Sequence, residues 1–128
     1  MKDAPSAKKL LYWFDPRYRG MASWGFILNR ITGLGLLLYL VLHLIVLSQL
    51  TQGAQAYDSF VTLMKSPIFI TGELLVIAAG IIHGLNGIRI GMNSFGIAVR
   101  YQFIMLVIVA LASGVGIIFF ASRMLGGA

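Results

Sequence analysis

The sequence predicts an all-α membrane protein with three transmembrane helices. Of its 128 residues, 59% are apolar and only 11% carry a charge, whereas a soluble domain uses about 25% charged residues to cover its surface. The apolar residues also gather into three long runs, each about 20 residues or more, which suits a hydrocarbon core about 30 Å thick. Because backbone groups in lipid must pair within their own segment, each run should be a helix.

The apolar runs place three helices at about residues 26–50, 68–90 and 101–122. Pro67 fits the first turn of the second helix, where a backbone N–H has no intrahelical partner to lose. The connection before it is long enough for a short interfacial helix near residues 57–64. Residues 1–25 should form a cytoplasmic or interfacial segment, and residues 26–122 one three-helix transmembrane domain.

Lysine and arginine are divided unequally between the two sides of the predicted bundle. Eight lie on the side of the N-terminal segment and the second connection, and two lie on the other side. The eight are Lys2, Lys8, Lys9, Arg17, Arg19, Arg30, Arg89 and Arg100, and the two are Lys65 and Arg123. Since cytoplasmic loops carry an excess of basic residues, the N-terminus is expected in the cytoplasm. Tyr18, Trp24 and Tyr101 should then lie at the cytoplasmic interface, and Tyr57 at the outer one.

The composition excludes several classes of site. The chain has no cysteine, which rules out a disulfide framework, a thiolate metal site, a cysteine-ligated iron–sulfur cluster and covalently attached haem. The net charge of +6 does not indicate nucleic acid, because the basic residues follow the predicted topology and form no patch with interleaved aromatics. A bound metal would need other ligands, and His43 and His83 are the only histidines.

Polar residues inside a span are functional candidates, because their burial in lipid costs a few kcal/mol or more. His43 falls in the outer half of the first helix and His83 in the inner half of the second, with a difference in depth of roughly 10–15 Å. The two histidines are therefore not expected to share one metal. A polar residue that merely bonds a neighbouring helix is the structural alternative, and His83 could also serve as a proton-relay residue.

Haem is a group that uses single histidines at separate depths. Its iron takes one axial imidazole from each of two helices, and small residues such as Gly84 and Gly87 would leave room for the macrocycle. Arg89 matches the carboxylate geometry of a haem propionate. Close helix packing would explain the glycines equally well, so residue types and spacing leave haem binding as one hypothesis among several.

Two motifs resemble those of a known family. The segment "HGLNGIR", residues 83–89, resembles the His-x-x-x-Gly-Ile-Arg motif of the cytochrome b membrane anchor of succinate dehydrogenase (complex II). The segment "NRITG", residues 29–33, is similar to that family's His-Arg-hydrophobic-Ser/Thr-Gly motif near the start of its first helix. The similarity covers roughly residues 17–100, and the three-helix plan matches.

This resemblance implies a multi-pass subunit of the inner (cytoplasmic) membrane of a bacterium or archaeon. It would be a non-catalytic member of an enzyme complex of the respiratory chain and tricarboxylic acid cycle. Its partners would be a flavoprotein, an iron–sulfur protein, a second membrane anchor and the lipid bilayer. Electrons from succinate would pass through the complex to a quinone, either ubiquinone or menaquinone.

The resemblance also assigns roles by position. His83 matches the axial ligand of haem b, Arg30 the arginine of the quinone pocket, and Arg89 the motif arginine, a propionate candidate. Asn29 stands where the family often has histidine, and Ser23 is the nearest serine to the family's serine position. The full set of implied cofactor-binding residues is His83, His43, Arg30, Arg89, Asn29, Gly33, Gly84, Gly87 and Ser23; none is expected to be catalytic.

His43 is additional to what a single haem requires. Family members with two haems resemble this chain in carrying a histidine there, so it is the candidate ligand of a second haem. Three other functions stay open: an anchor of a quinol:fumarate reductase, a haem-free anchor, and a proton-pathway subunit that uses His43, Glu73 and His83. Glu73 has no assigned role beyond reaching the outer interface.

Overall fold

The computed structural model describes residues 21–126, which form three long helices, one short helix and two single turns of 3₁₀ helix. In chain order these are α2 (Met21–Ser48), a 3₁₀ turn (Gln49–Gln52), α3 (Ala54–Met64), α4 (Pro67–Ser94), a second 3₁₀ turn (Val99–Tyr101) and α5 (Gln102–Gly126). The segments 23–52, 67–94 and 99–126 are long and apolar enough to cross a membrane. The three-span prediction is therefore confirmed, and so is the short helix between the first two spans.

Each long helix extends several residues beyond one end of its predicted range, although α2 ends at Ser48, slightly before the predicted end. Helix α2 begins at Met21 and takes in Trp24, whereas α4 continues to Ser94 and α5 to Gly126. A helix of 28 residues is about 42 Å long at 1.5 Å per residue, so it exceeds a 30 Å hydrocarbon core at its ends. Hydropathy detects only the part in hydrocarbon. Residues 21–25 of the predicted N-terminal segment are thus helical, and residues 1–20 lie outside the described range.

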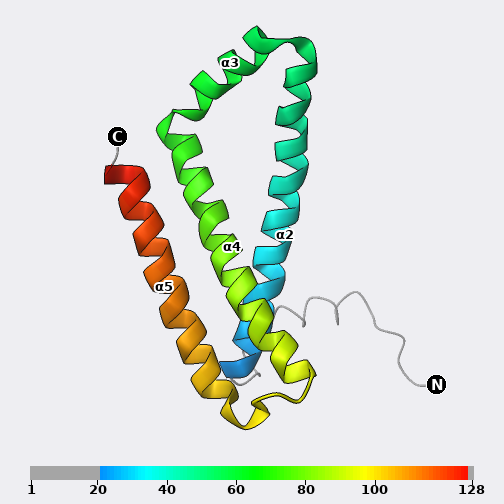
Figure 1. Ribbon diagram of the computed structural model, residues 1–128, viewed down its shortest axis with the longest axis vertical. Coiled ribbons are helices and arrows are strands. Elements are labelled where there is room, and N and C mark those ends of the chain that lie inside the picture. Colours follow the sequence, from blue (N-terminus) through cyan, green and yellow to red (C-terminus); the bar gives the residue numbers. More distant parts are fainter. Residues whose placement is uncertain (1–20, 127–128) are drawn as a thin grey trace, which may run out of the picture.

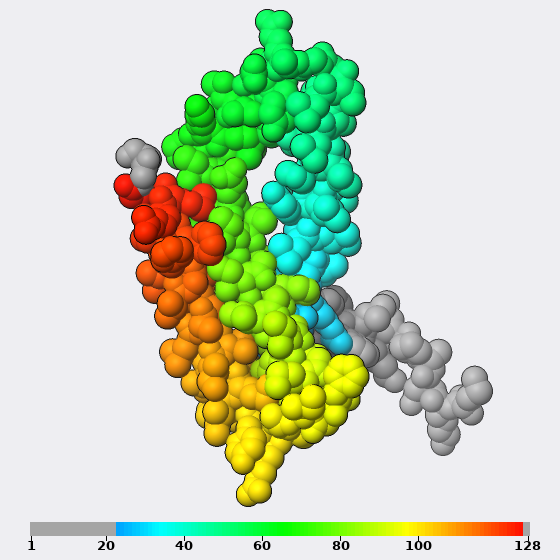
Figure 2. Space-filling model, viewed as in Figure 1, coloured from blue at the N-terminus to red at the C-terminus, as the bar shows by residue number. Residues whose placement is uncertain are grey.

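Helix α4 occupies the middle of the bundle and packs against both α2 and α5 (Figure 1). Helices α2 and α4 cross near the end of the bundle where α2 begins, and they diverge toward the opposite end, where α3 bridges them. The space-filling view shows an opening between the separated parts of α2 and α4, beneath α3 (Figure 2). Tight α2–α4 contact is therefore confined to one half of the bundle.

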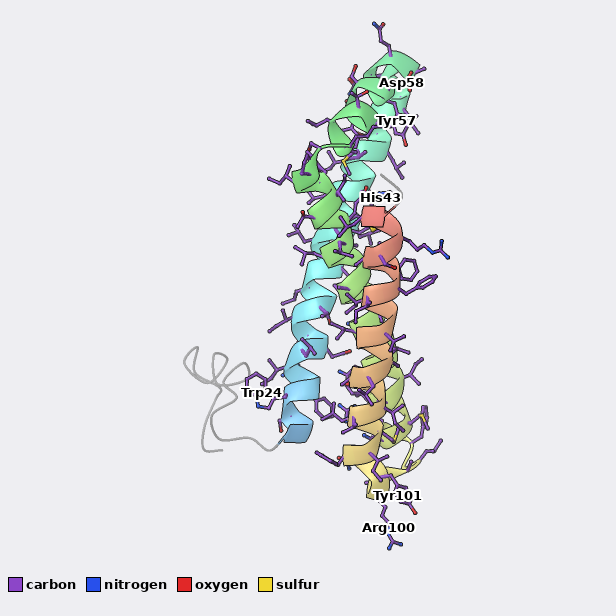
Figure 3. The ribbon with its side chains drawn as sticks, turned by 90° about the vertical axis from the view of Figure 1, so that its left-hand side faces the viewer. Trp24, His43, Tyr57, Asp58, Arg100 and Tyr101 are labelled. Carbon is purple, nitrogen blue, oxygen red and sulfur yellow. The ribbon has the colours of Figure 1, made fainter. Side chains whose placement is uncertain are left out.

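The two ends of the bundle carry the predicted interfacial residues. Tyr57 and Asp58 lie at the α3 end, whereas Arg100 and Tyr101 lie at the opposite end (Figure 3). The turn between α4 and α5 at that end requires positive φ at Gly96 and Ala98, with values of 75° and 55°. Tyr57 and Tyr101 are thus at opposite ends, as the sequence predicted.

Burial in this chain is the inverse of a soluble fold. Among residues whose side chains the structure describes, Ile27 is the only buried apolar residue, while four polar residues are buried: Thr32, Asn86, Arg89 and Ser113. Large apolar side chains such as Leu111 and Ile118 are exposed. An apolar surface of this extent needs lipid or another subunit to cover it.

The charge asymmetry predicts which end faces the cytoplasm, and single cysteines test it because the wild-type chain has none. Ser59 in α3 and Phe95 in the turn after α4 are both exposed, and α3 and that turn lie at opposite ends of the bundle (Figure 1). With a membrane-impermeant maleimide on intact cells, S59C should be labelled, and F95C should be labelled only after permeabilisation. The wild-type chain is the unlabelled control, and the reverse pattern would contradict the orientation.

Candidate functional site

The imidazole of His83 lies between α4 and α2 and is bonded through one nitrogen. Its Nδ1 is 3.0 Å from the backbone carbonyl oxygen of Asn29 and 3.4 Å from Oγ1 of Thr32. A carbonyl oxygen can only accept, so Nδ1 must carry the proton in this bond. In the neutral ring Nε2 then has no proton and keeps its lone pair, which is the state of a histidine that binds a metal.

Glycine lets the His83 ring approach the backbone of α2. A Cβ atom built on Gly33 would lie 2.9 Å from Cε1 of His83, so any larger residue there would displace the ring. The opposite holds at Gly84, which is exposed and where an added Cβ would meet no atom within 4 Å. The close packing at the ring is therefore supplied by Gly33, and the α4 surface beside it is open at Gly84.

A second polar cluster lies one turn further along α4. Asn86 and Arg89 are 2% and 1% exposed, respectively. The amide Nδ2 of Asn86 donates to the carbonyl oxygen of Gly25 and, at 3.4 Å, to Oδ1 of Asn29. Its Oδ1 accepts from Nε of Arg89 at 2.9 Å. The cluster therefore ties α4 to two successive turns of α2.

The guanidinium of Arg89 is buried without a counter-charge in the described part of the chain. Its Nη1 and Nη2 atoms are buried and make no hydrogen bond. A Cβ on Gly25 would overlap Nη2, so glycine at that position makes room for the guanidinium. The Phe26 ring lies 5.8 Å from its Cζ. Because an unpaired buried charge is costly, the guanidinium needs an acceptor that the described residues do not supply.

We call this contact region the α2–α4 seam. It comprises Gly25, Asn29, Thr32 and Gly33 of α2 with His83, Asn86, Gly87 and Arg89 of α4. Of the residues predicted from the sequence, it unites His83, Asn29, Gly33, Gly87 and Arg89. The prediction omitted Gly25, Thr32 and Asn86. The spacing of Asn86, three residues from both His83 and Arg89, could have indicated it, because such residues share one helix face.

Arg30 and Ser23 lie outside the seam. Arg30 is exposed and follows Asn29 directly, so it sits at nearly the same depth but about 100° further around α2. Ser23 is half-buried near the start of the same helix. Arg30 is thus at the depth of the seam but on a different side of α2 from Asn29.

His43 is separate from the seam, as predicted. It is exposed, stacks on Tyr39 with 5.4 Å between ring centroids, and has its Nδ1 3.5 Å from the Tyr39 hydroxyl. It follows Thr32 by eleven residues, which is about 16 Å along the helix. Because the His83 ring contacts α2 at Thr32, the two imidazoles lie too far apart to bind one metal together.

The comparisons with known proteins agree with the motifs. Residues 10–118 match the family described as succinate dehydrogenase/fumarate reductase transmembrane subunit. The chain is 34% identical over 102 residues to the succinate dehydrogenase 2 membrane subunit SdhC of Mycobacterium tuberculosis, which covers 79% of this chain and 71% of that protein. It is also 34% identical over 80 residues to the succinate dehydrogenase hydrophobic membrane anchor subunit of Halobacterium salinarum, which covers 62% of each chain.

Substitution of Gly33 tests the close approach of the His83 ring. In G33A the new methyl group should push the ring off the Asn29 carbonyl and forfeit a hydrogen bond, which contributes about 0.5–1.5 kcal/mol. Because the two Gly→Ala changes in α2 gain the same helix propensity, we expect G33A to unfold at a lower temperature than the control G35A in detergent, as followed by circular dichroism. The matched control is G35A, two residues on, where an added Cβ meets nothing within 4 Å and helix propensity improves by about 1 kcal/mol. Equal effects of the two substitutions would contradict the packing at Gly33.

Proposed function

Because the chain belongs to the succinate dehydrogenase/fumarate reductase transmembrane subunit family, we propose that it is the cytochrome b anchor of a succinate:quinone oxidoreductase. In this proposal it binds haem b and helps to form the site where a quinone receives electrons from the iron–sulfur subunit. The flavoprotein, the iron–sulfur protein and a second anchor complete the complex. The observation that carries the proposal is the bond between His83 Nδ1 and the Asn29 carbonyl, which leaves Nε2 for the iron.

The residues of the seam fit haem b. The donor is a single imidazole in the required tautomer, and the helix surface beside it is open at Gly84, where a flat macrocycle needs room. A second axial ligand would come from the partner anchor, since His43 lies too far away along α2. When bound, haem supplies one-electron transfer. The role of this chain is to hold and orient it.

The two arginines fit the polar groups of the ligands. The buried, unbonded Nη atoms of Arg89 match the two oxygens of a propionate carboxylate. The exposed Arg30 can donate to a quinone carbonyl at the same depth and favours negative charge there. Ser23, near the start of the same helix, is the hydroxyl candidate for that pocket. The Asn29 side chain is engaged by Asn86 and, as an amide, carries no proton to the quinone.

His43 is the candidate ligand of a second haem. To bind iron through Nε2, its Nδ1–H would donate to the Tyr39 oxygen, which lies 3.5 Å away. The stacked Tyr39 ring would then fix the plane of the imidazole. No carbonyl enforces this tautomer, so His43 is less constrained than His83.

Succinate oxidation is the direction that the relatives favour. Both are named as succinate dehydrogenase subunits, whereas the family description covers fumarate reductase as well. The residues of the seam would serve either direction, because haem and quinone are common to both.

Absorption spectroscopy tests the proposed function directly. The purified membrane complex should show a b-type α band in its reduced-minus-oxidised spectrum, and H83A should abolish the band of the haem bound at the seam, because the iron loses an axial ligand. T71A, far from the seam and with a hydroxyl bonded only within α4, is the control that should keep the wild-type band. A wild-type complex without any α band would leave the haem-free anchor or the proton-pathway subunit as the function.

The ratio of haem to flavin tests His43. If it ligates a second haem, the wild-type complex should contain two haems per flavin and H43A one, with the band of the haem at His83 retained. Pyridine haemochrome and flavin assays measure the two quantities. A ratio of one in the wild-type complex would assign His43 to its bond with Tyr39 instead.

A further inference from the structure

We propose that Asn86 is a positioning residue for His83. By joining α4 to α2, it holds the His83 ring in the register at which Nδ1 meets the Asn29 carbonyl. This inference rests on the proposed haem function. It concerns a residue that acts through His83 and has no assigned contact with haem.

The orientation of the Asn86 amide follows from its partners. Arginine can only donate, so the atom that accepts from Arg89 Nε must be the amide oxygen. The amide nitrogen is then turned toward α2, where the Gly25 carbonyl and the Asn29 side-chain oxygen accept from it. Arg89 thus fixes the amide in the direction that links the helices.

These bonds determine the register of the two helices. On α4, Asn86 lies three residues after His83, and on α2, its acceptor Gly25 lies four residues before Asn29, the acceptor of His83. The two donors are therefore about one turn apart on α4, and the two acceptors about one turn apart on α2. A slip of α4 along α2 would break the Asn86 and His83 bonds together. A buried amide left unbonded costs about 1–3 kcal/mol, and lipid offers no replacement partner.

The other contacts described between α2 and α4 restrict sliding of the two helices less than the Asn86 bonds do. Lipid removes the hydrophobic drive between helices, and Ile27 is the only apolar side chain buried in the described residues. The Thr32 hydroxyl is bonded to carbonyls of its own helix at 2.8 and 3.1 Å, so its proton is not available to α4. Asn86 therefore provides the strongest polar link across the seam besides His83 itself.

Loss of the Asn86 bonds would change the basicity of the His83 imidazole as well as its position. An axial imidazole whose Nδ1–H donates to a carbonyl is oriented and made more basic, and a more basic ligand favours oxidised iron. Loss of register lengthens this bond, which lowers the basicity of the imidazole. The midpoint potential of the bound haem would then rise. Destabilisation of the complex alone would lower the haem content but would not change the potential of the haem that remains bound.

The test is a redox titration of the intact complex carrying N86A. We expect reduced haem content and an upward shift of the midpoint potential of the retained haem, with a changed ferric EPR spectrum. The matched control is N93A in the same helix, because Asn93 Oδ1 is buried but makes no bond. N93A should keep the wild-type potential and EPR spectrum.

If N86A yields no assembled complex, N86D decides the question. It preserves the size of the side chain and the acceptor for Arg89 but loses both bonds donated to α2. Its EPR spectrum reports the orientation of the axial ligand and should change. If N86A assembles and keeps the wild-type potential, the inference about Asn86 is overturned, while the proposed function stands. If only N86D assembles, a wild-type EPR spectrum in that variant has the same consequence. Absence of an α band in the wild-type complex would instead reject the proposed function and this inference with it.

Discussion

This structure depends on the hydrogen bonds between α4 and α2, which satisfy the polar groups that water would satisfy in a soluble protein. In hydrocarbon a polar group must find its partner within the protein, and His83 and Asn86 find theirs on α2, at Asn29 and Gly25. Gly33 removes the side chain that would otherwise separate the His83 ring from the α2 backbone. The crossing of α2 and α4 in Figure 1 coincides with this seam, and the helices diverge beyond it. Polar pairing thus sets where the helices touch.

The burial pattern of the chain supports its proposed place in a complex. Its most completely buried side chains are those of Asn86 and Arg89, while its apolar side chains face outward. Helices α2 and α4 diverge beyond the seam, and α4 is open at Gly84, where an added Cβ would meet no atom within 4 Å. The unbonded Nη atoms of Arg89 need a partner, because a buried cation is stable only beside an acceptor or an anion.

The sequence predicted the parts of the fold that depend on local composition. Three apolar runs identified the three spans, and the connection around Tyr57 was correctly expected to contain a helix. The start of the first helix and the ends of the second and third were placed several residues too far inside, because a helix continues into the interface after its residues cease to be apolar. His83, Arg89 and Gly33 were identified from motifs. Asn86 was not, because an asparagine within a span is by itself consistent with any neighbouring helix.

Sequence alone determined that the chain crosses the membrane three times and that His43 and His83 lie at different depths, because both follow from a fixed rise per residue and a fixed thickness of hydrocarbon. Only the tertiary structure decided which nitrogen of His83 is bonded, which way the Asn86 amide points, and that Gly33 and not Gly84 lies against the ring. Those features depend on the rotation of α2 relative to α4. That rotation is set by contacts between residues more than 50 positions apart, which no local pattern records.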